Sequence, residues 1–207
     1  MLDGVPTVAR PTLADRTWWS AILRSVAPLD DAELARLAPH LETLTFAAGE
    51  PYLLAGAPAH RVALVKSGIL REYFTLEDGA ERTRSFAIEG DFSGSLSDLL
   101  RGGPARTSVM TEAKARVLSV PWAIVRELAA TRAPWRAMLH RITEQLYLAK
   151  AEREFELLAL DAEERHRRFL ARFPRLLPLV AQKHVASYLG ISPEHLSRIR
   201  ARRRPRA

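Results

Sequence analysis

The arginines near the C-terminal end of the chain are the side chains that most clearly indicate a chemistry. In the stretch VASYLGISPEHLSRIRARRRPRA, residues 185–207, regularly spaced apolar residues give way to a cluster of arginines. The chain carries 31 basic and 24 acidic side chains, of which residues 161–207 hold 12 basic and 4 acidic ones. The net charge is therefore +8 in this segment and −1 in residues 1–160. Such asymmetry predicts a module that binds a polyanion, attached to a body with another role.

Immediately before the arginines, the apolar spacing predicts two short helices around a tight turn. Gly190 can adopt the left-handed conformation that ends a helix, and Ser192 followed by Pro193 supplies an N-cap hydroxyl and a first-turn proline. The positions that fit a helix-turn-helix are Val185, Ala186, Leu189, Gly190, Ile191, Leu196 and Ile199. With the basic helix that follows, this pattern favours DNA binding over a generic helical hairpin. A solvated, disordered end is the alternative for the terminal arginines taken alone: Arg202, Arg203, Arg204 and Arg206.

The remaining reactive side chains do not form a recognisable catalytic or metal site. The histidines are scattered, with no pair at metal-ligand spacing between residues 43 and 121; they are His40, His60, His140, His166, His184 and His195. A nucleophile elbow, a phosphate-binding loop and paired catalytic carboxylates are missing, and Asp91 and Asp98 fit turn and helix-cap roles. The lack of cysteine excludes disulfides, thiolate metal sites and iron–sulfur clusters. We therefore expect no enzymatic activity, no metal and no cofactor. For His184 and His195, phosphate contact and solvent exposure are both open.

Length and composition indicate a globular protein. A chain of 207 residues allows one large domain or two small ones, and a hydrophobic content of 47% is ample for a buried core. No run approaches the roughly 18 apolar residues of a membrane span. The first residues, MLDGVPTVARP, contain neither an apolar signal core nor a basic leader. We expect a cytoplasmic protein with no membrane partner.

Two kinds of periodicity divide the chain before the arginines. Residues 13–27 and 30–40 are predicted to be short helices. From about residue 43 to residue 121, short β-prone runs such as RVALV, ILREYF and ARVLSV alternate with turn sequences such as KSG and EDGA. This spacing is typical of an antiparallel barrel or roll, with EDGA as a hairpin turn. Asp161 is expected to cap a further helix with Glu164 three residues on, and Pro174 to end it.

A long helix is predicted over residues 134–160. One apolar stripe on it consists of Trp135, Leu139, Ile142, Leu146 and Ala149, and a second consists of Leu148, Ala151, Phe155 and Leu158. Two stripes require two partners. We expect one stripe to pack on the roll and the other on the same helix of a second subunit, with the first stripe as the dimer contact. A monomer that buries both faces internally is the alternative.

This order of parts, a roll, a long helix, a capped helix and a helix-turn-helix, resembles the Crp-Fnr superfamily of bacterial transcription regulators. The resemblance covers about residues 28–203. Its most specific pieces are GDFSGSLSDLL (residues 90–100), which is similar to the family's phosphate-binding cassette, LLALDAEERHRRFLARFP, and the helix-turn-helix. It is closest to a shortened branch that ends soon after the recognition helix, because only seven residues follow Arg200, too few for a β-hairpin wing.

The resemblance implies an α+β fold in which a jelly-roll-like antiparallel β-roll of the cyclic-nucleotide-binding type is followed by a long dimerisation helix and a small all-α domain. The expected domains are residues 1–130 for the effector-type roll with its N-terminal helices, 131–160 for the dimerisation helix, and 161–207 for the helix-turn-helix. The implied function is homodimeric, DNA-binding transcription regulation. The implied partners are double-stranded DNA with an inverted-repeat operator, a second copy of the chain, RNA polymerase and a small-molecule effector.

Cyclic AMP is not expected to be that effector. In members that bind it, the cassette has a Glu for the ribose and an Arg-Ser pair for the cyclic phosphate, and the long helix offers a Thr-Ser pair to adenine. The matching positions here are Ser95, Arg106 with Thr107 after one extra residue, and Lys150 with Ala151. Losing the ribose carboxylate alone removes a hydrogen bond of about 1.5–3 kcal/mol. The residues expected to line a pocket for another small anion are Gly94, Ser95, Arg106 and Thr107; a role as ordinary loop residues is equally open.

The resemblance also assigns the DNA contacts. Pro193, Glu194 and Arg198 face the bases, where Glu194 can accept a hydrogen bond from cytosine and Arg198 can make a forked contact with guanine. The phosphate contacts are expected from Ser192, His195, Ser197 and Arg202, with Arg203, Arg204 and Arg206 as backbone clamps in place of a wing. The alternative function is a small-ligand-binding or enzymatic roll whose basic tail binds nucleic acid non-specifically.

Overall fold

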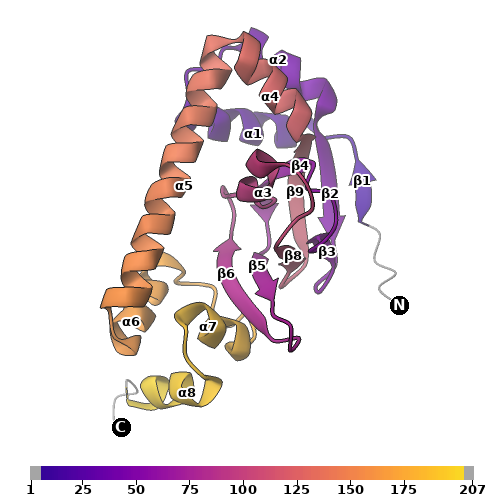
Figure 1. The fold of residues 1–207 in the computed structure, drawn as a ribbon. Helices are drawn as coiled ribbons and strands as arrows, with labels where there is room; N and C mark the ends of the chain where they lie inside the picture. The colour runs from indigo at the N-terminus through magenta and orange to yellow at the C-terminus, as the bar shows by residue number, and fades with distance from the viewer. Residues whose placement is uncertain (1–5, 203–207) are drawn as a thin grey trace.

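The computed structural model describes residues 6–202 and shows a β-roll flanked by helices (Figure 1). A five-stranded sheet has the strand order β1-β2-β9-β4-β7, and a four-stranded sheet has the order β3-β8-β5-β6. All pairings are antiparallel. The strands are β1 Thr7–Ala9, β2 Glu42–Phe46, β3 Pro51–Leu53, β4 Arg61–Ser67, β5 Leu70–Thr75, β6 Glu81–Ala87, β7 Phe92–Ser93, β8 Ser108–Thr111 and β9 Ala115–Pro121.

The two sheets share one apolar core because their strands alternate inward and outward side chains. Val65, Val109 and Val117 are completely buried in it, from β4, β8 and β9. The turn EDGA joins β5 and β6 as predicted: the Leu76 amide donates to the Ala80 carbonyl at 2.9 Å, and the Asp78 side chain accepts from the Ala80 amide. This hairpin fixes which side chains of β5 and β6 lie opposite each other.

A second core holds the N-terminal helices against the later ones. The helices are α1 Leu13–Val26, α2 Asp31–Leu37, the 3-10 helix Ala38–His40, α3 Leu96–Arg101, α4 Trp122–Thr131, α5 Ala133–Ala159, α6 Ala162–Arg172, α7 Gln182–Leu189 and α8 Pro193–Arg202. Trp19 of α1, Leu34 of α2, Trp122 of α4 and Trp135 of α5 are buried together. The Trp135 indole donates to Glu33 at 2.8 Å, so the one polar atom of this large side chain is satisfied.

The third core belongs to the C-terminal helices and reaches into the roll. Asp161 caps α6 by accepting from the Glu164 amide at 2.8 Å, as predicted, and α6 ends at Arg172, just before Pro174. Phe169 and Phe173 then pack with Tyr188 of α7 and with Phe86 of β6, whose ring centroids lie 5.6–6.3 Å from the three others. The helix-turn-helix segment is therefore docked on β6 through an aromatic cluster.

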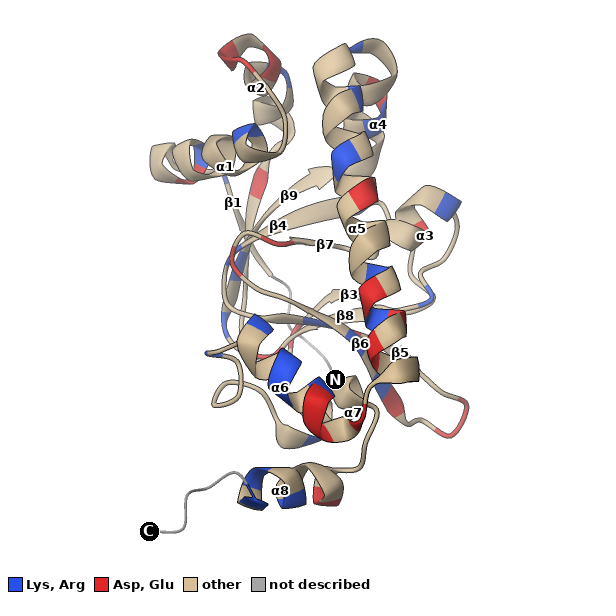
Figure 2. Cartoon of the chain, turned by 90° about the vertical axis from the view of Figure 1, so that its left-hand side faces the viewer, with Lys and Arg blue, Asp and Glu red and all other residues tan. Residues whose placement is uncertain are grey.

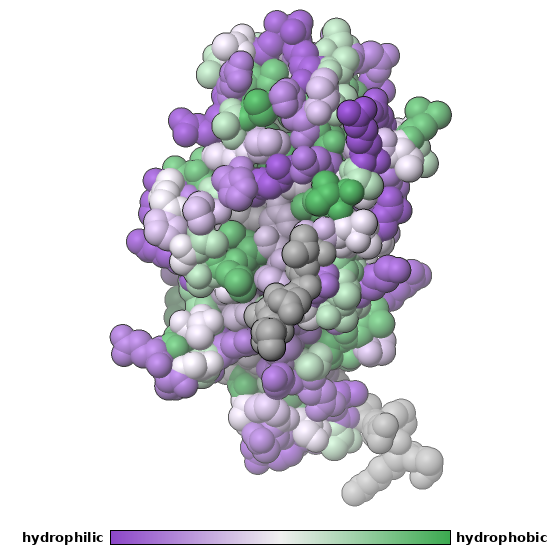
Figure 3. Space-filling model, turned by 90° about the vertical axis from the view of Figure 1, so that its right-hand side faces the viewer, coloured by the Kyte–Doolittle hydropathy of each residue, from purple (hydrophilic) through white to green (hydrophobic). Residues whose placement is uncertain are grey.

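The predicted fold class is confirmed: an antiparallel roll is followed by a long helix and a small helical segment. Three elements were missed, β1, β7 and α3, because runs of three, two and six residues are too short to show a periodicity. The domain boundaries remain a prediction. On the side of the roll that carries β1, hydrophilic and hydrophobic side chains are interspersed (Figure 3), whereas α5 stands along the opposite side (Figure 1).

Candidate functional site

The turn between α7 and α8 has the predicted helix-turn-helix geometry. Gly190 has a φ of 69°, the left-handed conformation in which a side chain is disfavoured, and its amide bonds to the last turn of α7. Ser192 caps α8 by accepting from the His195 amide at 3.2 Å. The apolar positions between the helices are buried: Val185, Ala186, Leu189, Leu196 and Ile199. Burial of these side chains leaves the opposite face of α8 free.

Each predicted DNA contact that the structure describes is exposed: Ser192, Pro193, Glu194, His195, Ser197, Arg198 and Arg202. Arg203, Arg204 and Arg206 lie outside the described residues. Arg202 forms an exposed ion pair with Glu163 of α6, with 3.1 Å between Nη1 and Oε1. A hydrogen bond from Ser192 lowers the pKa of Glu194, which keeps this carboxylate ionised and able to accept. The contacts to DNA themselves remain a prediction.

Charge and position set α8 apart from the roll. Figure 2 shows α8 at one end of the molecule, beyond α7, with Lys and Arg positions along it and along the neighbouring α6. Arg198 and Arg202 are four residues apart and border a small cavity on α8 together with His195. A helix that presents several cations at the end of a molecule can approach a phosphate backbone without a clash from the body.

The other helix of the pair, α7, is held to the roll by polar contacts. Ser187 Oγ accepts from the Thr83 amide at 2.9 Å, at the open edge of β6, and donates to the Glu81 carbonyl at 3.1 Å. His184 Nδ1 lies 2.8 Å from Glu112, in the turn between β8 and β9. The sequence left phosphate contact or solvent exposure open for His184, and the structure argues against solvent exposure. Its side chain is only 16% exposed because it contacts the roll.

Arg71 of β5 supports that contact from within the roll. Its guanidinium is buried, pairs with Glu112 at 2.5 Å and with Glu81 at 2.6 Å, and lies over the Tyr73 ring. Burial raises the pKa of Glu112, but hydrogen bonds from His184 and Arg71 outweigh it, so the net shift is downward. The roll and α7 thus share one charged cluster with fixed partners.

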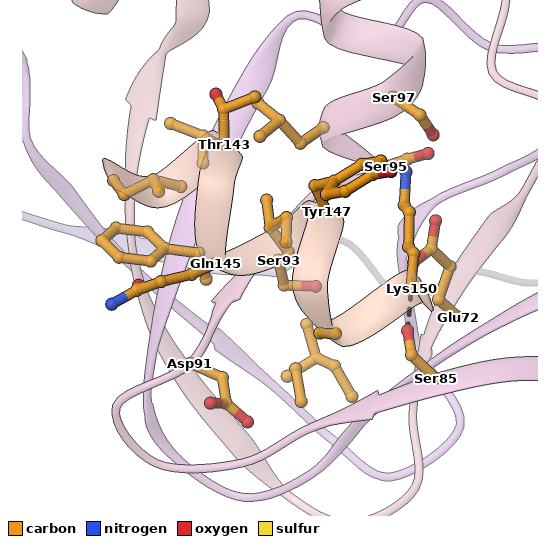
Figure 4. A pocket seen from close by; sticks show the side chains of 18 of the residues that line it. Glu72, Ser85, Asp91, Ser93, Ser95, Ser97, Thr143, Gln145, Tyr147 and Lys150 are labelled. Atoms are coloured by element: carbon orange, nitrogen blue, oxygen red, sulfur yellow. Dashed lines mark hydrogen bonds between the residues drawn. The ribbon is translucent and has the colours of Figure 1, made fainter. Parts of the chain in front are cut away.

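A groove of about 860 Å³ runs between α5 and the roll. Side chains of α1, α4 and the first half of α5 line one part, and side chains of α6 and α7, including Phe173 and Tyr188, line another. Between them lies a polar part formed by β5, β6, the cassette and Lys150 of α5. Figure 4 shows Lys150 reaching toward Ser95 and Glu72, with Asp91 on a separate side.

The polar part of the groove is organised around Glu72. Its carboxylate accepts from Arg84 at 2.6 Å, from Thr107 at 2.8 Å and from Ser85 at 3.1 Å. Thr107 is also 3.0 Å from Ser95, which donates to Asp98. The sequence did not single out Glu72 or Arg84. The sequence signal that could have found them is the EDGA hairpin, because its register places Glu72 opposite Ser85, next to Arg84.

The predicted effector residues are only partly brought together. Ser95 lines the groove and has a φ of 52°, a left-handed value that is uncommon outside glycine; Thr107 is buried behind it. Gly94 packs closely, since a Cβ there would lie 2.7 Å from the Arg61 carbonyl. Arg106 is exposed and contributes its amide, which donates to Asp98 at 2.9 Å, rather than a groove-lining side chain. Lys150 lines the groove, but Ala151 does not.

The α5 stripe predicted to contact a second subunit faces inward. Trp135 and Ile142 are buried in the core with α1 and α4, Leu139 and Leu146 pack against that core, and Ala149 lines the groove. The exposed large apolar side chains of α5 are instead Tyr147, Leu148, Phe155, Leu157 and Leu158. Trp135 and Ile142 are therefore unavailable to a second copy, whereas Leu139, Leu146 and Ala149 are only partly buried, and the dimer face stays a prediction. The second stripe is the one that remains open.

Among residues 6–202, no group of three or more His, Cys, Asp or Glu side chains could hold a metal ion. Within the same range, no helix is long and apolar enough to cross a membrane.

Comparison with known proteins extends this picture. Residues 43–132 match the family described as "Cyclic nucleotide-binding domain". Electron transport regulator A of Shewanella oneidensis is 25% identical over 167 residues, and the fumarate and nitrate reduction regulatory protein of Vibrio cholerae is 25% identical over 165 residues. Each match includes 74% of this chain but only 65% of the relative, so the chain spans less than two thirds of these curated proteins.

Among solved structures, FixK2 from Bradyrhizobium japonicum superposes with a TM-score of 0.68 at 23% identity, over 77% of this chain and 82% of that one. The curated relatives are regulators by name rather than enzymes. These comparisons confirm the predicted fold and the predicted resemblance.

Proposed function

On the confirmed resemblance to the Crp-Fnr superfamily, we propose that this chain is a homodimeric transcription regulator that binds DNA through α8 and acts by binding rather than by catalysis. The observation that carries the proposal is the helix-turn-helix itself. Its apolar positions are buried and its cap is made, while all described residues assigned to DNA are exposed. A core helix pair with no further role would not need such a cationic outer face.

The chemistry of that face suits both base and backbone contacts. Arg198 presents a guanidinium that can bind guanine O6 and N7 through two hydrogen bonds, and ionised Glu194 can accept from cytosine. Arg202 would exchange its exposed ion pair with Glu163 for a phosphate. That exchange costs little, because exposed ion pairs contribute at most about 1 kcal/mol. One copy of α8 could therefore read the bases of a major groove and contact its phosphates at the same time.

The homodimer is proposed to form along the exposed stripe of α5. Leu148, Phe155 and Leu158 recur at helical spacing and belong to the second stripe of the sequence, with Tyr147 beside them. Leu158 is 80% exposed and Tyr147 is 70% exposed, which is costly for apolar side chains on one helix face. A second copy would cover them. The operator would then be an inverted repeat with half-sites about one helical turn apart, and RNA polymerase is the proposed partner on the DNA.

The test is DNA binding by the full chain. Genomic fragments are selected with the protein, and affinity for the selected site is measured by fluorescence anisotropy at several salt concentrations. Arg198→Ala should weaken that site by about 1–3 kcal/mol, roughly 5- to 150-fold, and relax the preference at one base pair of each half-site. Arg126→Ala is the matched control, since Arg126 is an exposed arginine of α4, at the other end of the molecule (Figure 1).

The proposal fails if the chain selects no fragment, or if Arg126→Ala weakens binding as much as Arg198→Ala. Equal loss on every sequence with Arg198→Ala would show that Arg198 contacts only phosphate, and α8 would then not be the reader.

A further inference from the structure

The groove between α5 and the roll contains an apolar part. Its apolar wall includes Ile22, Val26, Trp122, Met138, Leu139 and Ile142. Trp122 is 94% buried, and its Nε1 is itself covered, so this donor does not face the groove. This part of the groove therefore suits an apolar chain.

The polar part of the groove has an excess of positive charge. Four basic side chains and two acidic ones line the groove as a whole: Arg84, Lys150, Arg153 and Arg172 against Glu72 and Asp91. Arg84 is neutralised by Glu72, and Arg153 pairs with Glu156. Lys150 has no ion pair with any described residue. Burial, and then the charge of Arg84, lowers the pKa of Lys150. An anion beside Lys150 would therefore offset the free-energy cost of keeping its ammonium charged.

A phosphate is a poor match for this polar part. The guanidinium of Arg84 and the hydroxyls of Thr107 and Ser85 already donate to Glu72. A doubly charged group such as phosphate at that position would be repelled by the Glu72 carboxylate more strongly than a singly charged carboxylate would. Within residues 6–202, Lys150 and Arg172 are the groove cations without an ion pair, and Lys150 reaches toward the polar part (Figure 4). Its single ammonium matches a single carboxylate.

We propose that this groove binds an elongated organic acid, with its carboxylate at Lys150 and its acyl chain between α5 and the roll. The proposal deepens the proposed function, because it names the class of effector, and it rests on that function only for its regulatory meaning. Twelve residues separate Met138 from Lys150 on α5, which is roughly 18 Å along a helix. An extended acyl chain fits that length, and a compact ring system does not fill it.

Calorimetry on the full chain tests the proposal with octanoate, decanoate and dodecanoate. Affinity should rise roughly tenfold for each two added methylene groups, since each buried methylene contributes to transfer from water. Decanol, which lacks the charge, and cyclic AMP should bind at least tenfold more weakly than decanoate. Lys150→Met should reduce decanoate affinity at least tenfold, while Lys114→Met, at an exposed lysine outside the groove, should leave it unchanged.

The proposal is overturned if no carboxylate binds, if decanol binds as well as decanoate, or if Lys150→Met and Lys114→Met behave alike. DNA binding without ligand is measured on the same samples. Its loss would refute the regulator, whereas intact DNA binding with no carboxylate binding would refute only the effector class.

Discussion

The contact between His184 and Glu112 should decide how firmly the helix-turn-helix is docked on the roll. His184→Ala removes the hydrogen bond that joins α7 to the β8–β9 turn at 2.8 Å. Glu112 keeps Arg71 as a partner, so no buried carboxylate is left unpaired. The perturbation is therefore confined to the junction between the two parts.

The expected magnitude follows from burial and charge. A hydrogen bond to a charged group contributes about 1.5–3 kcal/mol, and the 16% exposure of His184 with a retained partner for Glu112 places this one near 1.5 kcal/mol. That value corresponds to a factor of about ten in the equilibrium between docked and undocked α7. It also corresponds to a fall in Tm of roughly 3–6 °C for a chain of this size.

Hydrogen exchange at the Thr83 amide is the specific assay. This amide sits at the open edge of β6 and is bonded to Ser187 of α7, so it exchanges only when α7 leaves the roll. His184→Ala should speed its exchange about tenfold, while amides between β4 and β9 keep their rates. His140→Ala, an exposed histidine of α5, is the control. Unchanged Thr83 exchange with a lowered Tm would show that His184 supports the fold as a whole and that the docking argument is incorrect.

Three further outcomes are expected. Burial raises the pKa of Asp15, but hydrogen bonds from Lys66 and Thr12 and the charge of Arg116 outweigh it, and the pKa falls from 3.8 to about 2. Because the folded pKa lies below the unfolded one, this stability is present above pH 4 and is lost as pH falls toward 2. Asp15→Asn should cost about 2 kcal/mol in denaturant unfolding at neutral pH and remove that acid dependence; an unchanged acid profile would contradict it. Leu158→Glu should convert dimers to monomers in analytical ultracentrifugation while circular dichroism keeps its helical signal, since the side chain is 80% exposed within one chain; intact dimers would move the interface elsewhere. Cyclic AMP should show no micromolar binding in calorimetry, and such binding would mean that Glu72 leaves its present partners.

The fold was largely predictable because the residues that form its turns, caps and helix ends act locally. EDGA, Asp161 with Glu164, and Gly190 each specify a turn, a cap or a helix end through the residue's own backbone or side chain, and the structure contains each one. The helix-turn-helix was predictable for the same reason, since its apolar positions and its turn lie within one short stretch. Local signals do not depend on what packs against them.

The faces of α5 could not be assigned in this way. Its two apolar stripes have equivalent spacing, and the choice between them depends on the contacts of Trp135. This residue packs with α1 and α4, and its hydrogen-bond partner Glu33 is 102 residues away in the sequence. The groove was hidden for a related reason. Glu72 and Lys150 come from distant segments, and only the packing of α5 on the roll makes them neighbours.

The docking contacts and the proposed DNA contacts lie on different helices of the pair. His184 and Ser187 of α7 face the roll, whereas Arg198 on α8 is exposed. The docking of α7 on the roll consequently leaves α8 uncovered. Docking would affect DNA binding by setting the position of α8 relative to the α8 of a second copy. Tyr188 and Phe173 belong both to the aromatic cluster on Phe86 and to the wall of the groove. A ligand in the groove can alter that placement only if it binds the docked and undocked arrangements with different affinity. These two rings are the side chains through which such a difference would reach α7.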